Sequence, residues 1–357
     1  MQKTLLSGVK PTGTVHIGNY FGAMRQFVDR QDDYRQFIFL ANYHALTSVS
    51  DGDKLRELTL DLALDYLAIG IDPKKTTLFL QSDVPEVTEL TWIFNTLTTV
   101  PYLMRAHAFK DAINKNSKSF SSDSSEIKFN DEGTLGSTSI SMEEYTEHVF
   151  KGINVGLFDY PILMASDILM YGTDIVPVGL DQKQHIEIAR DTAQKFNNAF
   201  GETFKMPEPI ILEEVQTVVG TDGRKMSKSY GNTIPLFGTD DEIKKAVMSI
   251  PTDSKGVEEP KDPATCKVFA MHELFPGEEL DALRARYVAG GIGYKESKDL
   301  LVEKIIKFIS PMRARREEIA RDPEAVLKIL REGGEVARAQ AQKMMSEVRA
   351  KVGLTLK

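Results

Sequence analysis

The chain has 357 residues, of which 41% are hydrophobic and 27% charged, and its formal net charge is −8. This length allows two domains, and the composition is that of a globular protein. No apolar run approaches the roughly 20 residues of a membrane-spanning helix, and no signal-peptide pattern opens the chain. The single cysteine, Cys266, excludes an intrachain disulfide and a cysteine-rich metal site. We therefore expect a cytoplasmic protein that does not enter a membrane.

The charge is unevenly distributed. From Tyr294 to the end, 15 Lys and Arg residues stand against 10 Asp and Glu residues, so the preceding part is acidic. A modestly basic C-terminal region can contact a polyanion, and it can equally be a solvated helical face. Composition leaves a nucleic-acid contact open.

Short apolar segments alternate with amphipathic ones up to about residue 235. The predicted strands are 3–8, 36–42, 76–82, 173–179 and 215–220. Helices are predicted between them, one capped by Asp53 and ended by Gly70, and a long one beginning at Asp181. This order predicts an α/β fold with a Rossmann-like, doubly wound parallel sheet, which binds ligands at the carboxyl ends of its strands.

Two regions differ from this pattern. Residues 111–152 are rich in Ser, Asn and Gly, which predicts a mobile insertion. From Thr239, which begins a capping-box pattern, the chain is predicted to be all helical, including the segment after Gly333-Gly334. The predicted domains are an α/β domain over 1–235 that carries the insertion and an all-helical C-terminal domain over 236–357.

The turn after the first strand reads "SGVKPTGTVHIGNYFG". Gly13 and Gly18 have the spacing of a Walker A loop, but Asn19 stands where lysine is needed, and no GxGxxG pattern is present. The segment from His16 to Asn19 opens a helix, where free backbone N–H groups and the helix dipole favour phosphate. A buried capping histidine beside a packing glycine would explain the same residues, so this motif alone does not define a site.

A second motif, "GRKMSKSYGN" (223–232), sets Lys225 and Lys228 among glycines and serines. By itself it is either a solvated loop or a flexible holder for an anionic ligand. The pair "HIGN" and "KMSKS" resembles the two signatures of class I aminoacyl-tRNA synthetases. The segment "DYPILMASDILMYGTDIVPVGLDQKQHIEIARD" (159–191) is similar to the amino-acid pocket of the tryptophanyl family.

This resemblance implies that ATP activates L-tryptophan to an adenylate, which is then transferred to tRNA(Trp). It implies a catalytic, nucleotide-binding domain over 1–235 and an anticodon-recognition domain over 236–357. It also implies a homodimer and Mg²⁺ bound together with ATP.

The resemblance also implies the site residues. The catalytic residues would be His16, Asn19, Lys225 and Lys228. ATP would contact Lys10, Pro11, Thr12, Gly18, Asn19, Gly179, Leu180, Asp181, Val218, Lys225, Met226, Ser227, Lys228 and Ser229. Tryptophan would contact Asp167, Met164, Tyr160, Gln182, His44, Leu6, Val176 and Val178. Asp167 would accept the indole N–H, Met164 would lie beside the ring, and Tyr160 and Gln182 would hold the α-ammonium group.

Several alternatives stay open. Asp167 would otherwise be a helix-surface or capping residue, although its segment is otherwise apolar. A tyrosyl enzyme shares both motifs, but usually has Gln where Met164 stands. A non-catalytic paralogue and a small adenylyltransferase are further alternatives. Many relatives have Gln at the place of Lys10 and Asp at the place of Asn42. Either Lys110 or Lys115 is expected to reach phosphate.

Overall fold

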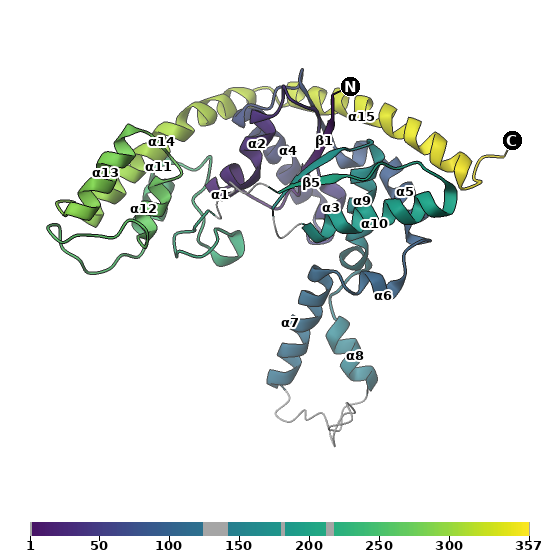
Figure 1. The fold of residues 1–357 in the computed structure, drawn as a ribbon, viewed down its shortest axis with the longest axis horizontal. Helices are drawn as coiled ribbons and strands as arrows, with labels where there is room; N and C mark the ends of the chain where they lie inside the picture. The colour runs from purple at the N-terminus through teal and green to yellow at the C-terminus, as the bar shows by residue number, and fades with distance from the viewer. Residues whose placement is uncertain (1, 124–141, 180–182, 212–217, 357) are drawn as a thin grey trace.

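The computed structural model describes residues 2–123, 142–179, 183–211 and 218–356. Five parallel strands form one sheet in the order β3-β2-β1-β4-β5. They are β1 (Thr4–Val9), β2 (Arg35–Leu40), β3 (Thr76–Leu80), β4 (Ile175–Val178) and β5 (Glu208–Ile211). The predicted α/β fold with a doubly wound parallel sheet is confirmed (Figure 1).

Helices account for most of the remaining described chain. In the first part these are α1 (Ile17–Asn19), α2 (Arg25–Asp29), α3 (Asn42–Ala45), α4 (Gly52–Ile69), α5 (Glu86–Asn95), α6 (Val100–Leu103), α7 (His107–Asp123), α8 (Met142–Phe150), α9 (Val155–Met170) and α10 (Lys183–Phe200). The second part contains α11 (Asp240–Met248), α12 (Lys267–His272), α13 (Glu278–Ala289), α14 (Tyr294–Ile319) and α15 (Pro323–Lys351). Shorter turns are Tyr20–Met24, which is π-helical, and the 3-10 turns Gln81–Asp83 and Lys228–Tyr230.

Alternate strand residues pack into two separate cores, because successive side chains of a strand point to opposite faces of the sheet. Leu5 and Ile38 belong to the core that contains α4 and α14 residues. Leu6 and Phe37 belong to the other core, with α5, α9 and α10. Both faces of the sheet are therefore covered, and its carboxyl edge is left for a site.

The last strand is not where the sequence predicted it. The strand β5 is Glu208–Ile211. Of the predicted strand 215–220, residues 215–217 lie outside the described residues, and in the described part Val219 forms only an isolated bridge to Lys225. Because β5 lies at the edge of the sheet and pairs on one side with β4, it tolerates Pro209. The edge strand was therefore not predicted, because a proline such as Pro209 counts against a strand.

Two helix boundaries also differ. Asp51, not Asp53, caps α4 by accepting from the backbone N–H groups of Asp53 and Lys54, at 2.9 and 3.1 Å. Gly70 ends that helix in the left-handed conformation, as predicted. The predicted start of α10 at Asp181 lies outside the described residues, and the helix is described from Lys183.

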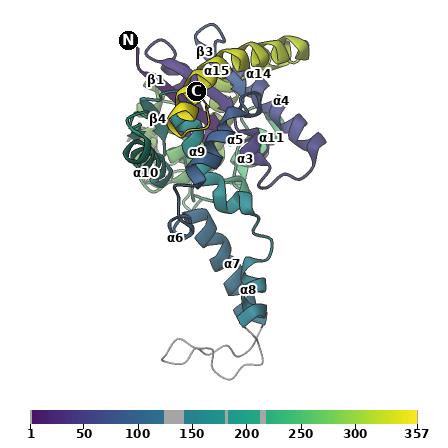
Figure 2. The ribbon, with the colours of Figure 1, turned by 90° about the vertical axis from the view of Figure 1, so that its right-hand side faces the viewer.

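The predicted insertion is helical at both described ends. Helices α7 and α8 lie side by side and project from the body of the molecule (Figures 1 and 2). The side chain of Asn116 on α7 donates to the carbonyl of Val149 on α8 at 2.8 Å. Residues 124–141 of the insertion lie outside the described residues. The serine-rich composition therefore did not indicate the helices at the two described ends of the insertion.

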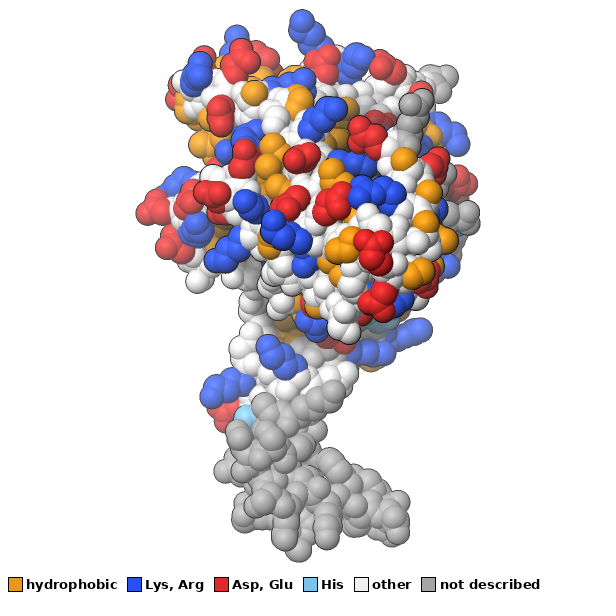
Figure 3. All heavy atoms as spheres, turned by 90° about the vertical axis from the view of Figure 1, so that its left-hand side faces the viewer, with side chains coloured by type: hydrophobic (Ala, Val, Ile, Leu, Met, Phe, Trp, Pro, Cys, Tyr) orange, Lys and Arg blue, Asp and Glu red, His pale blue; other side chains and the backbone are white. Residues whose placement is uncertain are grey.

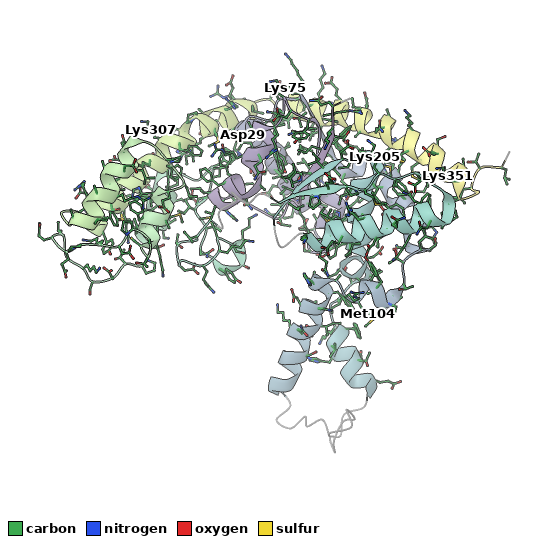
Figure 4. All side chains as sticks on the ribbon, in the orientation of Figure 1. Asp29, Lys75, Met104, Lys205, Lys307 and Lys351 are labelled. Carbon is green, nitrogen blue, oxygen red and sulfur yellow. The ribbon has the colours of Figure 1, made fainter. Side chains whose placement is uncertain are left out.

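Helix α15 is continuous through Gly333-Gly334 and returns from the helical region to the sheet (Figure 1). It packs along β3, the strand at the other edge. A Cβ atom at Gly333 would overlap the carbonyl group of Leu78, and one at Gly334 would lie 2.9 Å from Asp83 Oδ2. The two glycines thus allow the helix to approach the strand closely. Lys351 lies at the far end of this helix (Figure 4). Its Nζ donates to Thr203 Oγ1 at 2.8 Å.

Surface charges are mixed. Figure 3 shows Lys and Arg side chains interspersed with Asp and Glu over the face of the helical region. Within the described ranges, no helix combines the length and the apolar character needed to cross a bilayer.

Candidate active site

One face of α9 forms a wall of a large cavity. Asn154 caps this helix by accepting from the N–H of Leu157 at 2.8 Å. Tyr160, Met164 and Asp167 follow at positions i, i+4 and i+7, which lie on one helical face. All three line a cavity of about 620 Å³, together with residues at the carboxyl ends of β1 and β4. The fold therefore places the cavity where parallel sheets bind ligands.

Asp167 lines this cavity and is almost completely buried, with 1% of its surface exposed. Its Oδ2 atom accepts from Gln81 Nε2 at 2.7 Å and lies 3.0 Å from His44 Nε2. Burial raises the pKa of the Asp167 carboxyl, and the hydrogen bonds from His44 and Gln81 act in the opposite direction. A carboxylate buried in this way is neither a solvated surface group nor a helix cap.

Gln81 was not predicted as a site residue. It follows β3 directly, so its position at the carboxyl end of a strand was the available signal. Nothing in the sequence, however, indicated that Gln81 contacts Asp167, which is 86 residues further along the chain.

His16 caps α1, as expected for a buried capping histidine. Its Nδ1 accepts from the N–H of Asn19 at 3.2 Å, and Asn19 Oδ1 accepts from the N–H of His16 at 3.1 Å. Since Nδ1 is an acceptor, the ring proton is on Nε2. Burial and the nearby charge of Lys228 lower the pKa of His16 to about 4. His16 is therefore a neutral donor near pH 7.

The lysine-bearing loop lies directly against α1. The N–H of Gly18 donates to the sulfur of Met226 at 3.3 Å, and the N–H of Ile17 donates to the carbonyl of Ile234 at 3.0 Å. Burial lowers the pKa of Lys228. Its Nζ lies 3.7 Å from the position that a Cβ of Gly13 would occupy. Both sequence motifs thus meet at one end of the sheet.

Asn232 organises this loop from within and was not singled out from the sequence. Its Oδ1 accepts from the N–H of Ser227 at 2.8 Å. Its Nδ2 donates to Asp222 Oδ1 at 2.7 Å and to the carbonyl of Lys225 at 3.1 Å. A buried amide therefore fixes the backbone on both sides of Met226.

Half of the predicted site residues that the structure describes line the cavity. Those that line it are Leu6, Lys10, Asn19, His44, Tyr160, Met164, Asp167, Val176, Val178 and Gly179. Pro11, Thr12, His16, Gly18, Val218 and Lys225–Ser229 are not among its lining residues. Leu180, Asp181 and Gln182 lie outside the described residues. Lys10 Nζ donates to Thr47 Oγ1 at 2.8 Å, and burial lowers the pKa of Lys10.

The chain is similar over nearly its full length to several proteins that are named tryptophan--tRNA ligases. The family described as tRNA synthetases class I (W and Y) matches residues 2–310. A tryptophan--tRNA ligase of Rhodopirellula baltica is 45% identical over 351 residues, covering 98% of this chain and 99% of that protein. One from Fusobacterium nucleatum is 44% identical over 355 residues, covering 99% and 98%.

The same likeness holds in three dimensions. The crystal structure of tryptophanyl-tRNA synthetase from Campylobacter jejuni, complexed with ADP and tryptophan, matches with a TM-score of 0.83 at 43% identity. The match covers 98% of this chain and 99% of that one.

Fold, paired motifs and similarity together define a class I aminoacyl-tRNA synthetase, and the chain belongs to the tryptophan and tyrosine family of that class. Within this family it groups with the tryptophan--tRNA ligases, the relatives that it matches over their full length. The predicted family is thereby confirmed, and the role of each site residue stays a prediction.

Proposed function

We propose that this chain activates L-tryptophan with ATP, forming tryptophanyl-adenylate and diphosphate, and then transfers the tryptophanyl group to tRNA(Trp). Full-length similarity to tryptophan--tRNA ligases supports this activity. The observation that carries the choice of a substrate with a ring hydrogen-bond donor is the buried carboxylate of Asp167, which lines the cavity, and the similarity to tryptophan--tRNA ligases supports tryptophan over tyrosine.

Asp167 selects tryptophan by accepting its indole N–H. The apolar side chains of Leu6, Met164, Val176 and Val178 line the same cavity and supply surfaces for the ring. Phenylalanine has no ring donor, so binding it would leave a buried carboxylate oxygen without a partner. Tyr160 and Gln182 hold the α-ammonium group, and His44 lies close by: the side chains of Tyr160 and His44 line the same cavity.

Adenylate formation needs positioning more than acid–base chemistry. A carboxylate oxygen of tryptophan bonds to the α-phosphorus of ATP, and the bond from that phosphorus to the bridging oxygen of diphosphate breaks. The attacking carboxylate is already ionised, so no protein base is required. The neutral Nε2–H of His16 and the N-terminus of α1 stabilise charge on the α-phosphate.

The remaining ATP contacts come from the loops around this centre. Lys225 and Lys228 stabilise the departing diphosphate, and Lys10 adds positive charge inside the cavity. We expect Gly179 and Asp181, which follow β4 in the sequence, to contact the ribose, and Val218 to contact the adenine. Mg²⁺ reaches the site with ATP and is held mainly by phosphate oxygens, which are its preferred ligands.

The helical region over 236–357 recognises the anticodon of tRNA(Trp), and the enzyme acts in the cytoplasm. An ion pair joins this region to the catalytic domain: Arg316 Nε lies 2.6 Å from Asp65 Oδ1, and Arg316 also contacts Asp61 at 3.1 Å. Burial raises the pKa of Asp65 to about 6. The two domains therefore share a partly buried charge network on the helix α4.

Two chains associate into a homodimer through an apolar surface on α5, α3 and the start of α9. Trp92 is 73% exposed, Leu46 57% and Val155 79%, which is unusual for large apolar side chains. Leu46 also lines a second cavity of about 330 Å³ that would receive a partner side chain. Met104, at the base of the α7–α8 projection, is 43% exposed and extends the apolar character (Figure 4).

The activity is tested by aminoacylation of purified tRNA(Trp) with labelled tryptophan. The expected result is ATP-dependent charging of tRNA(Trp) and none of tRNA(Tyr). Charging of tRNA(Tyr) with tyrosine would favour the tyrosyl alternative, and absence of any charging would favour a non-catalytic paralogue. Sedimentation of the wild type and Trp92→Arg tests the dimer, which the substitution should dissociate.

A further inference from the structure

Gln81 occupies an unusual place between two chain segments. It begins the 3-10 turn after β3 and is 1% exposed. Its Oε1 accepts from the backbone N–H groups of Tyr43 and His44, at 3.0 and 3.3 Å. The side chain therefore satisfies two donors at the beginning of α3, the short helix that carries His44.

These backbone contacts determine the orientation of the amide. A backbone N–H can only donate, so the oxygen of Gln81 must face Tyr43 and His44. The amide nitrogen must then face Asp167, whose Oδ2 accepts from it at 2.7 Å. Because an amide NH₂ group cannot accept, Asp167 Oδ2 is always an acceptor in this arrangement.

We propose that Gln81 is a positioning residue for tryptophan selection, which holds Asp167 as a hydrogen-bond acceptor directed at the indole N–H. This inference rests on the proposed function. With Oδ2 occupied by Gln81 and His44, the other carboxylate oxygen is left for the ligand in the cavity. A substrate with a ring N–H satisfies that oxygen, and a substrate without one does not.

His44 is positioned by the same amide. Its backbone N–H bonds to Gln81, and its ring Nε2 lies 3.0 Å from the oxygen that Gln81 contacts. Gln81, Asp167 and the start of α3 thus form one connected group across three elements. Loss of the Gln81 side chain would release both the carboxylate and the histidine that face the cavity.

A purely structural role makes a different prediction, and the chain provides a matched control. Gln36 in β2 is fully buried, donates to the carbonyl of Phe27 at 2.9 Å and accepts from Thr76 Oγ1 at 2.9 Å. It belongs to the same sheet and makes comparable hydrogen bonds, but none of them is to Asp167. Replacement of Gln36 tests what loss of a buried amide does by itself.

The experiment compares tryptophan with 3-benzothienylalanine, in which sulfur replaces the ring N–H. KM and kcat are measured by ATP–diphosphate exchange for the wild type, Gln81→Met and Gln36→Met. The wild type should prefer tryptophan, and Gln81→Met should reduce this preference roughly 10- to 100-fold, because a hydrogen bond to a charged group is lost. The change should come from a higher KM for tryptophan. Gln36→Met should keep the preference.

A second variant covers the case that Gln81→Met does not fold. Gln81→Asn keeps the amide but is one methylene shorter, so it cannot reach both α3 and Asp167, and its preference for tryptophan should also fall. The inference is wrong if either folded Gln81 variant keeps the wild-type preference, or if Gln36→Met loses it equally. If the wild type shows no exchange with tryptophan, the proposed function fails instead.

Discussion

The backbone N–H of Gly18 donates to the sulfur of Met226 across 208 residues of sequence, with an N···S distance of 3.3 Å. A Cβ atom at Gly18 would lie 3.1 Å from the Cβ of Met226 and 2.9 Å from His16 Nδ1. The absence of a side chain at Gly18 therefore lets the two sequence motifs touch.

Gly18→Ala should separate the motifs slightly and slow adenylate formation roughly 10- to 100-fold, because displacements of about 1 Å at a reacting centre have such effects. Pre-steady-state adenylate formation measures this rate. Gly52→Ala is the control, since the nearest atom to its Cβ would be the end of Arg56 at 3.7 Å. A wild-type rate for Gly18→Ala would show that this contact does not position the site.

Lys228→Ala should lower the rate of adenylate formation by roughly 100- to 1,000-fold and change tryptophan affinity little, because its charge acts on the departing diphosphate. Burial lowers the pKa of Lys228, so the rate should fall as pH rises, with a midpoint below the ordinary lysine value. Single-turnover rates and tryptophan titrations separate the two effects. Lys74→Ala, in an exposed turn, is the control. Equal loss of rate and affinity would contradict this role.

Gly333→Ala should destabilise the fold by roughly 2 kcal/mol, although alanine is the better helix former, because the new methyl group would overlap the backbone of Leu78. Urea unfolding measures the change. Ala339→Gly, at an exposed position of the same helix, should cost about 1 kcal/mol through helix propensity alone. Stabilisation by Gly333→Ala would mean that α15 does not pack against β3 as described.

His272 should make the fold sensitive to acid. It is fully buried, its Nε2 lies 3.1 Å from the carbonyl of Ser297, and its Nδ1 has no partner among the described residues. Burial and the charge of Lys304 lower the pKa of His272 to about 4, so the folded state resists the proton that the unfolded state takes up. Stability present above pH 6.5 is therefore lost as pH falls towards 4.

The loss attributable to His272 should be about 1.4 kcal/mol per pH unit between pH 6.5 and 5. Unfolding free energies of the wild type and His272→Gln over this range measure it, and the variant should show the smaller slope. His107→Gln, at an exposed position, should leave the slope unchanged. Parallel slopes for the wild type and His272→Gln would contradict the argument.

The sequence predicted the parts of the fold that follow from local pattern. Strands β1 to β4 and the end of α4 at Gly70 were found because apolar runs and a terminal glycine carry direct signals. The strand β5 was missed, since an edge position permits a proline that the pattern counts against a strand. Helix was predicted after Gly333-Gly334, but the close approach of Gly333 to Leu78 was not, because it is a contact between distant parts of the chain.

The candidate site also contains some residues that could be predicted from the sequence and others that could not. Asp167, Met164 and Tyr160 share a helical face that can be read from their spacing, and the two motifs are recognisable as a pair. Partnerships between distant segments could not be predicted. The departure at Asn42 is an example: its side chain exchanges hydrogen bonds with Ser82, donating to Oγ at 2.7 Å and accepting from the N–H at 3.1 Å. Gln81 and Asn232 are further examples, because the hydrogen-bond partners of these polar side chains are known only from the folded structure.

The central claim is that the cavity around Asp167 activates tryptophan. ATP–diphosphate exchange measured with tryptophan, tyrosine, phenylalanine or no amino acid tests it most directly. Exchange should depend on tryptophan, with phenylalanine at the level of no amino acid. Exchange supported by tyrosine alone, or equally by phenylalanine, would contradict it.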